Sequence, residues 1–291
     1  MKLIRFDEGR IGIVAEGDRV IDVSDVVGPD LPGSPPVAMN RLIDMYAQYE
    51  PILKKRALSA LTSLSLDAVR LLAPVPAASK VIAYPVNYDD HAREMGQSVR
   101  APAQGFFLKP PSSLSGAGEP IVLPAIDASR RVDHECELAI VIGKRGRDIP
   151  REKWQEHVFG YSCLIDVVVR GKEERVARKA FDTFCPMGPW IVTADEVGDP
   201  SRLRGRLWVN DELRQDANNR DLVLDIPGMV EMASQVMTLE PGDIIAGGTP
   251  AGVGPIKPGD RVRIEFERVG SMVIGVVQGD SGRGPLFRQP A

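Results

Sequence analysis

Residues 132–144 read VDHECELAIVIGK, a stretch that joins two closely spaced acids to a long apolar run. Successive side chains of a β-strand point to opposite faces, so Glu135 and Glu137 would lie on the same face. Like charges on one face repel each other unless water screens them or a cation lies between them. The apolar run 138–142 is typical of a central strand buried on both faces. The stretch is therefore either a solvated strand end or a pair of carboxylates that holds a cation.

A third acid, Asp166, lies inside another apolar run, SCLIDVVV (162–169). A buried carboxylate needs a partner, which here is either an arginine such as Arg170 or Arg175 or a cation shared with the two glutamates. The shared cation explains all three acids at once. Carboxylate oxygens are hard ligands that suit Mg²⁺, Mn²⁺ or Ca²⁺ better than Zn²⁺.

Composition excludes several classes of protein. The 291 residues are 43% hydrophobic and 26% charged, as in ordinary globular proteins. The net charge of −4 argues against a nucleic-acid partner, which usually needs a basic face. No apolar run is long enough to cross a bilayer, and MKLIRFDEGR carries charges where a secretion signal needs an apolar run. Three cysteines are an odd, sparse set that favours a reducing compartment, so we expect a cytoplasmic protein without membrane partners. The absence of CxxC spacing argues against a structural zinc site.

The chain divides near residue 75, where LLAPVPAASK contains Pro74 and Pro76. Before this linker, short strands with Gly turns precede a helical pattern over 39–64, which predicts a small N-terminal α/β accessory domain over 1–75. From Lys80 onward, short β-rich runs alternate with Gly/Pro turns, so 76–291 is predicted to be a mainly β (α+β) domain of mixed or antiparallel architecture.

Three local patterns are clear within the second domain. Turn residues around Asn210-Asp211 and around Gly270 predict two β-hairpins. Asp225 is placed to cap a helix that has Pro227 in its first turn.

A second group of polar residues lies in NYDDHAREMG (87–96). His91 and Glu94 stand three apart, so they share one face of a helical turn, where the carboxylate would orient the imidazole as a general base. The alternative is a surface helix capped by Asp89 or Asp90. The Gly/Pro loop that follows, GQSVRAPAQG (96–105), is of a kind that allows a lid to close over a site.

Two further segments suggest chemistry. Lys179, in ARKAFDTFCPMGPW (177–190), is either a surface charge or a cation that offsets nearby carboxylates. The Gly-rich PGDIIAGGTPAGVG (241–254) is either a plain turn or a loop that presents N–H groups and a Thr hydroxyl to an anion.

Taken in order, these segments resemble the fumarylacetoacetate hydrolase superfamily over about residues 80 to 277. The matching pieces are NYDDHAREMG, FFLKP, DHECELAIVIGK, YSCLID, RKAFDTFCPMGPW and LEPGDIIAGGTPAGVG with IKPGDRVRIEFERVG. The resemblance implies a mixed β-sandwich roll, one bound Mg²⁺ or Mn²⁺ per subunit, and usually a homodimer. An extra N-terminal domain recurs in the longer members of the family.

The resemblance also assigns roles to residues. The metal-binding E-x-E…D pattern of the family falls on Glu135, Glu137 and Asp166, which electrostatics had already singled out. Its active-site lysine falls on Lys179.

The remaining roles fall on the lid and on the Gly-rich turn. The His–Glu dyad of the family falls on His91 and Glu94, and its substrate-side Gly-Thr turn falls on Gly248 and Thr249.

The chain departs from the family pattern at two places. Many members carry a Gln soon after the metal-binding Asp, whereas VVVRGKEERVAR (167–178) contains none. The residue before the Asp is often Asn and is Ile165 here, which makes the pocket more apolar.

We therefore expect an enzyme, a divalent-metal-dependent hydrolase that cleaves a C–C bond of a β-diketo acid such as an acylpyruvate or fumarylpyruvate. The alternative is an isomerase or decarboxylase of a 2-oxo or 2-hydroxydienoate acid, oxaloacetate included, in aromatic-compound catabolism. The expected partner is a small 2-oxo acid. Lys109, Arg93 and Arg100 are the candidates to bind its carboxylate.

Overall fold

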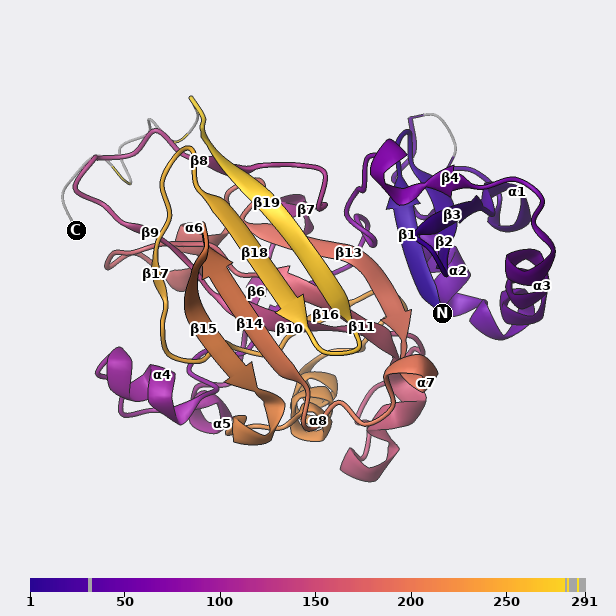
Figure 1. Ribbon diagram of the computed structural model, residues 1–291. Helices are drawn as coiled ribbons and strands as arrows, with labels where there is room; N and C mark the ends of the chain where they lie inside the picture. Colours follow the sequence, from indigo (N-terminus) through magenta and orange to yellow (C-terminus); the bar gives the residue numbers. More distant parts are fainter. Residues whose placement is uncertain (31–32, 281, 283–286, 288–291) are drawn as a thin grey trace.

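The structure is a computed structural model that describes residues 1–30, 33–280, 282 and 287 (Figure 1). Two large sheets pack face to face, and a third, three-stranded sheet lies at their edge. Helices gather around the ends of the strands (Figure 1). Within the described residues, no helix has the length and apolar character needed to cross a membrane. The predicted mainly β, mixed architecture is confirmed.

The larger sheet has the strand order β4-β3-β2-β1-β13-β11-β10-β16-β5-β6, with β7 paired to β13. Its strands after residue 75 are β5 (Val81–Ala83), β6 (Phe107–Lys109), β7 (Leu114–Ser115), β10 (Cys136–Ile142), β11 (Val158–Ile165), β13 (Cys185–Thr193) and β16 (Ile244–Ala246). Every residue of β10, β11 and β13 is buried. The apolar run in the opening stretch thus forms a central strand, as predicted.

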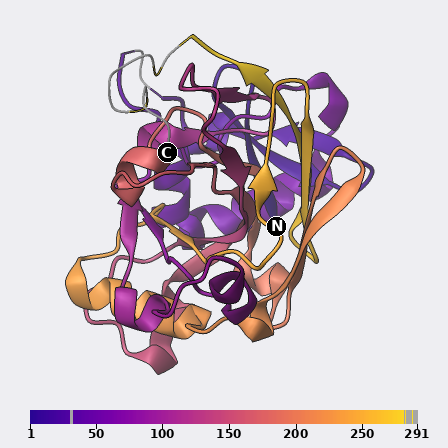
Figure 2. The same cartoon turned by 90° about the vertical axis from the view of Figure 1, so that its left-hand side faces the viewer.

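The second large sheet has the order β15-β14-β18-β19-β8 and packs against β10, β11 and β13. Its strands are β8 (Ile121–Leu123), β14 (Arg204–Val209), β15 (Glu212–Asn218), β18 (Arg261–Phe266) and β19 (Gly270–Gln278). Inner residues of β14 and β18 alternate with outer ones, as expected for a sheet with one solvated face. Both predicted hairpins, β14–β15 and β18–β19, are confirmed. This sheet lies in front of the larger one in Figure 1 and at the right in Figure 2.

Short elements fill the remaining edge and ends. The small sheet joins β9 (Val132–His134), β12 (Val168–Val169) and β17 (Gly254–Pro255). The helices after residue 75 are α4 (Asp89–Glu94), α5 (Ala101–Gln104), α6 (Arg175–Lys179), α7 (Ala194–Val197) and α8 (Ile226–Val236). Helix α8 begins as predicted, because Oδ1 of Asp225 accepts a hydrogen bond from the Gly228 N–H at 3.1 Å.

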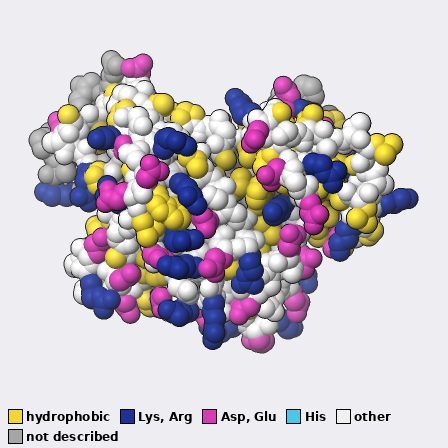
Figure 3. Space-filling view, viewed as in Figure 1, with side chains coloured by type: hydrophobic (Ala, Val, Ile, Leu, Met, Phe, Trp, Pro, Cys, Tyr) yellow, Lys and Arg dark blue, Asp and Glu magenta, His cyan; other side chains and the backbone are white. Residues whose placement is uncertain are grey.

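The first 75 residues form β1 (Lys2–Phe6), β2 (Arg10–Ala15), β3 (Arg19–Asp22), β4 (Leu64–Ser65), α1 (Ser24–Val27), α2 (Ala38–Asp44) and α3 (Tyr46–Ser59). Strand β1 pairs with β13, so these strands extend the larger sheet. A notch in the surface separates them from the rest of the molecule (Figure 3). On the same face, acidic and basic side chains are interspersed (Figure 3).

The single helical pattern predicted over 39–64 is wrong in its details. Two helices, α2 and α3, occupy it, and they are interrupted at Met45. Leu64 belongs to β4, where it pairs with Val20 of β3. The tertiary pairing of strands here outweighs the local helical preference.

Candidate active site

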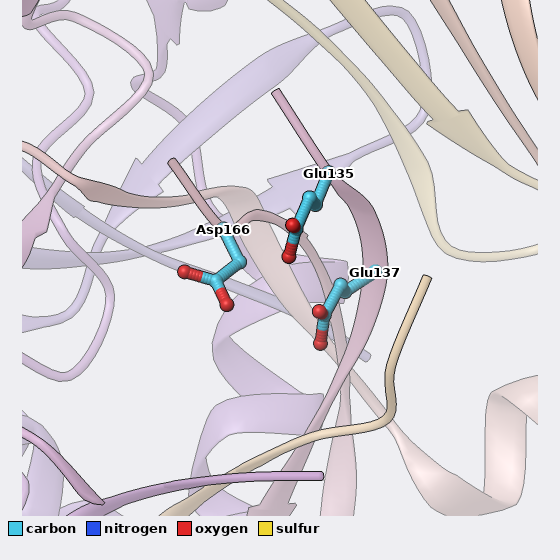
Figure 4. Close-up of side chains that lie close together, drawn as sticks. All are labelled: Glu135, Glu137 and Asp166. Atoms are coloured by element: carbon cyan, nitrogen blue, oxygen red, sulfur yellow. The ribbon is translucent and has the colours of Figure 1, made fainter. Parts of the chain in front are cut away.

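The three candidate metal ligands meet where β10 and β11 pair. Glu135 lies between β9 and β10, Glu137 lies in β10, and Asp166 directly follows β11. The antiparallel register places Cys136 opposite Ile165, and the Asp166 N–H donates to the Glu135 carbonyl oxygen at 2.9 Å. All three carboxylates point into the same space (Figure 4). The pairing of β10 with β11 thus brings Asp166 close to Glu135 and Glu137, which precede it by 31 and 29 positions in the chain.

The carboxylate cluster fits a small divalent ion. One oxygen from each of the three buried side chains lies within 4.8 Å of the others. Oxygens around one Mg²⁺ at about 2.1 Å are at most about 4.2 Å apart, so the ligands need to close only slightly. Glu137 is the carboxylate that most needs a cation. Among the described residues its side chain accepts a single hydrogen bond, from the Gly248 N–H, and has no ion pair within 4.0 Å.

Three basic side chains offset the other two carboxylates. The Lys179 ammonium donates to Glu135 Oε2 at 2.6 Å and to Asp166 Oδ2. Lys109 donates to Asp166 Oδ1 at 2.7 Å from the opposite side. Arg170 donates to Glu135 Oε1 at 3.0 Å. Asp166 is therefore paired with two lysines, where the sequence had suggested Arg170 or Arg175.

These surroundings shift the pKa values of Glu135 and Glu137 in opposite directions. Burial, with the nearby negative charge of Asp166, raises the pKa of Glu137 well above its usual range. Burial also acts on Glu135, but the charges of Lys179 and Arg170 outweigh it and hold the pKa of Glu135 well below its usual range. Burial lowers the pKa of Lys179, yet Asp166 and Glu135 more than compensate and raise it.

The predicted dyad is in contact. His91 and Glu94 both lie on α4, and His91 Nδ1 is 3.2 Å from Glu94 Oε2. The other Glu94 oxygen, Oε1, accepts a hydrogen bond from the Gly252 N–H at 2.9 Å. The His91 side chain is 8% exposed, and His91 lines the same cavity as Glu135. The helix begins at Asp89 with Tyr88 before it, and no side chain caps it.

The Gly-rich turn holds carboxylates of the protein itself. The Gly248 N–H donates to Glu137 Oε2 at 2.8 Å, while Gly252 holds Glu94 from the same loop. Gly248 has φ of +95°, and a Cβ there would lie 2.6 Å from the Cβ of Asn87, so no other residue fits. The loop thus ties the carboxylate cluster to the dyad.

Gln215, a residue that sequence reasoning missed, fixes the neighbouring Thr249. Its Nε2 donates to Thr249 Oγ1 at 2.7 Å and to the Pro250 carbonyl at 2.9 Å. Its Oε1 accepts from the Cys136 N–H at 2.9 Å and lies 3.1 Å from His134 Nδ1. The carbonyl can only accept and the amide N–H can only donate, so both amide atoms of Gln215 are assigned without ambiguity. The Thr249 hydroxyl therefore accepts from Gln215 and keeps its own proton for the cavity that it lines.

Asn87, whose role was also missed, anchors the backbone just before α4. It is fully buried and donates to the carbonyls of Leu224 at 2.9 Å and Gly247 at 2.8 Å. Its Oδ1 accepts from the Leu224 N–H at 2.7 Å. Its neighbour Val86 has φ of +53°, an unusual value for a β-branched residue, and lines the cavity. Asn87 begins the segment NYDDHAREMG singled out above, but no role was predicted for it or for Val86.

The carboxylates, His91, Lys179 and Thr249 line one cavity of about 340 Å³. This volume is within the range of small-molecule sites. Three arginines also line the cavity, and they were not predicted to contact substrate: Arg170, Arg175 and Arg178.

The three basic residues expected at the substrate carboxylate lie elsewhere. Lys109 is buried below the cavity, where Asp166 and two backbone carbonyls surround its ammonium group. Arg93 lines a separate hollow together with Asp89 and Asp90. Arg100 donates to Asp89 Oδ1 at 2.7 Å on the surface.

Comparison with known proteins identifies the family. The family model of the fumarylacetoacetate (FAA) hydrolase C-terminal domain matches residues 80–277. The chain belongs to the fumarylacetoacetate hydrolase family. A maleylpyruvate hydrolase of Aquipseudomonas alcaligenes is 44% identical over 293 residues, which cover 95% of this chain and 99% of that protein.

Two solved structures of this family also match over nearly the whole chain. A crystal structure of maleylpyruvate hydrolase from Sphingobium sp. SYK-6, in complex with manganese(II) and pyruvate, has a TM-score of 0.88 and 54% identity, covering 96% of this chain and 100% of that one. A 5-carboxymethyl-2-hydroxymuconate delta-isomerase from Mycobacterium smegmatis has a TM-score of 0.73 and 36% identity, covering 97% and 100%. The predicted family is confirmed, as is the prediction of a metal-dependent hydrolase, and the predicted divalent metal agrees with the buried carboxylate cluster.

Proposed function

We propose that this protein hydrolyses an acylpyruvate of the maleylpyruvate or fumarylpyruvate type. The observation that carries the proposal is the His91–Glu94 dyad, whose His91 lines the same cavity as the buried carboxylate cluster. Maleylpyruvate hydrolases that cover nearly the whole chain at 44% and 54% identity support the same substrate class.

The metal would be held by Glu135, Glu137 and Asp166. Bound there, Mg²⁺ or Mn²⁺ would act as a Lewis acid that withdraws charge from the oxygens of the 2-oxo acid. The manganese in the Sphingobium relative and the three hard oxygen ligands here support this assignment.

The dyad supplies the general base. Glu94 accepts a hydrogen bond from His91 Nδ1–H, which leaves the lone pair of Nε2 free to take a proton from water. The Gly252 N–H holds the second oxygen of Glu94 and so restricts rotation of the carboxylate. The lid helix therefore orients its own base before substrate arrives.

The bond changes follow from this arrangement. The hydroxide oxygen formed at His91 adds to the acyl carbonyl carbon, and the C–C bond between that carbon and the pyruvate methylene breaks. The electron pair of this bond remains on the three-carbon fragment as an enolate, which takes a proton and leaves as pyruvate. The acyl group leaves as a second carboxylic acid. Lys179, buried beside the carboxylates, supplies positive charge where the enolate forms.

A second candidate is isomerisation or decarboxylation of a 2-oxo or 2-hydroxydienoate acid such as oxaloacetate. It needs the same enolate but no attacking water. The lack of Gln between Asp166 and Lys179 and the similarity to a muconate isomerase favour it. The retained dyad favours hydrolysis.

Turnover of a defined panel of substrates separates the two candidates. The panel is acetylpyruvate, fumarylpyruvate, oxaloacetate and a 2-hydroxymuconate-type dienoate, each with Mg²⁺ or Mn²⁺ and with EDTA, followed by NMR. We expect metal-dependent release of two carboxylic acids from the acylpyruvates. His91→Asn should lower kcat by about 10²–10⁴-fold, whereas His157→Asn, a change away from the cavity, should not. Ketonised dienoate or carbon dioxide without diketo cleavage would instead support the second candidate.

The wider setting is also a proposal. We propose a cytoplasmic homodimer that acts in the breakdown of aromatic compounds. Three free, buried cysteines, Cys136, Cys163 and Cys185, support a reducing compartment. Light scattering coupled to gel filtration would test the dimer, since one chain has a mass of 31.7 kDa.

A further inference from the structure

Three arginines of the segment between Asp166 and Lys179 reach the cavity, but only one of them is neutralised. Arg170 donates from Nε to Asp133 Oδ2 at 2.7 Å and from Nη2 to Glu135 Oε1 at 3.0 Å. Its positive charge is therefore balanced by the protein, and it has little capacity left for an external anion.

Arg175 and Arg178 have no such counter-ion. Among the residues that the structure describes, neither has a carboxylate oxygen within the 4.0 Å that defines an ion pair. Arg175 donates to the neutral amide oxygen of Gln104 at 3.1 Å and stacks 5.3 Å from the ring centre of Phe107. Arg178 donates only to backbone carbonyls, those of Glu173 at 2.8 Å and Val169 at 3.3 Å.

The position of this pair makes the missing counter-ion costly. The two residues lie three apart on α6, so both guanidinium groups belong to one wall of the cavity, and each is partly buried. Burial lowers the pKa of Arg175 and outweighs the opposing charges of Glu135 and Asp166. Burial, with the charges of Arg170 and Arg175, likewise lowers the pKa of Arg178. Partly desolvated like charges without an anion are unfavourable, and a bound carboxylate would remove the cost.

We propose that Arg175 and Arg178 bind a second carboxylate, at the far end of the acyl chain, and so select dicarboxylic acylpyruvates over acetylpyruvate. The guanidinium fork matches a carboxylate in shape and charge, and its unused N–H donors line the same cavity as the carboxylate cluster. The pyruvate end would lie at the carboxylate cluster and the charged end of the acyl chain at α6. This inference rests on the proposed acylpyruvate hydrolysis and adds the residues that would recognise the end of the acyl chain.

Kinetics with two substrates test the assignment. The wild type, Arg175→Gln, Arg178→Gln and the double variant would be compared on fumarylpyruvate and on acetylpyruvate, which lacks the second carboxylate. We expect kcat/KM for fumarylpyruvate to fall at least ~10-fold in each single variant, mainly through KM, and acetylpyruvate turnover to stay nearly unchanged. Arg145→Gln, an exposed arginine paired with Glu240, is the matched control.

A binding measurement does not depend on turnover. Titration calorimetry of the EDTA-treated protein would compare maleate with isocrotonate, its cis analogue with one carboxylate. We expect maleate to bind more tightly and Arg175→Gln to abolish the difference. Thermal unfolding of each variant would show that it is folded.

The outcomes are distinct. Equal losses on both substrates, or no loss on either, would overturn the second-carboxylate subsite, because the arginines would then bind the shared end of the substrate or none of it. If neither acylpyruvate is cleaved but maleate still binds through Arg175, the proposed function fails and the subsite stands. If maleate and isocrotonate bind alike to wild type and variants, the subsite fails even when both acylpyruvates are cleaved.

Discussion

Glu137 differs from the other two candidate metal ligands in its partners. Glu135 and Asp166 are each held by basic side chains, whereas Glu137 accepts a single backbone hydrogen bond. Glu137→Gln keeps that bond, because the amide oxygen still accepts from Gly248, but it removes the charge that attracts a cation. We expect Mn²⁺ affinity to fall at least ~100-fold, measured by electron paramagnetic resonance titration of the EDTA-treated protein.

The stability of the same variant gives an independent check. Removing one of three buried, mutually repelling carboxylates should leave the metal-free protein equally stable or more stable. A marked loss of stability without metal would mean that Glu137 has a structural role that its contacts do not reveal. Glu265→Gln, on β18 of the second large sheet, is the control for loss of a glutamate charge.

Gln215 gives a second prediction at the residue scale. Its amide is fully used by Thr249, Pro250, Cys136 and His134. Gln215→Leu would leave buried donors and acceptors without partners, so we expect the free energy of unfolding to fall by about 1–3 kcal/mol, measured by urea denaturation. Gln48→Leu, an exposed change of the same chemistry on α3, should have little effect. Equal effects of the two changes would contradict the role given to this network.

The site residues that the sequence predicted best are those that electrostatics or helical spacing singles out. Glu135, Glu137 and Asp166 were singled out because buried like charges require a partner, and His91 with Glu94 because they stand one helical turn apart. The substrate contacts were not predictable in this way. Lys109 follows an apolar pair of residues like many surface lysines, and only the fold shows that its ammonium lies under Asp166.

At the scale of elements, the start of α8 was predicted from Asp225, and its contribution can be measured. Asp225→Ala removes the hydrogen bond to the Gly228 N–H, and we expect a loss of about 1 kcal/mol in unfolding free energy. Asp225→Asn keeps a capping oxygen while losing the exposed ion pair with Arg151, so most of the stability should remain. If Asn costs as much as Ala, the ion pair and not the cap stabilises the helix.

The Gly-rich turn shows where prediction from sequence stops. Its turn character and its N–H groups followed from the glycines, but the acceptor of each N–H depends on which segments fold against the turn. In the structure these acceptors are Glu137 and Glu94, so the loop organises the protein's own carboxylates. The end of the helix predicted over 39–64 failed for the same reason, since pairing with β3 places Leu64 in a strand.

At the scale of the whole molecule, the mainly β architecture followed from short alternating runs, whereas the joining of the N-terminal strands to the large sheet did not. Lys2 pairs with Val192 and Leu3 with Ile191, and the pairing links segments almost 190 residues apart. No local pattern encodes such a distant partner. The predicted domain boundary at residue 75 stays a prediction, because two domains can change in composition at that point and still share one continuous sheet.

The shared core provides the last prediction. Leu3 is fully buried and belongs to one apolar cluster with Val141, Ile191 and Ile244 of the catalytic strands. If this cluster makes the molecule one cooperative unit, calorimetry should show a single unfolding transition, and Leu3→Ala should lower the free energy of unfolding by about 2–5 kcal/mol without splitting it. An independently folding accessory domain would instead give two transitions, of which Leu3→Ala lowers only one. Leu58→Ala, at an exposed position of α3, is the control.

Because β13 lies beside β11, whose end carries Asp166, loss of Leu3 should also weaken Mn²⁺ binding if the transition is single. The carboxylate cluster would then depend on packing that begins at the first strand of the chain.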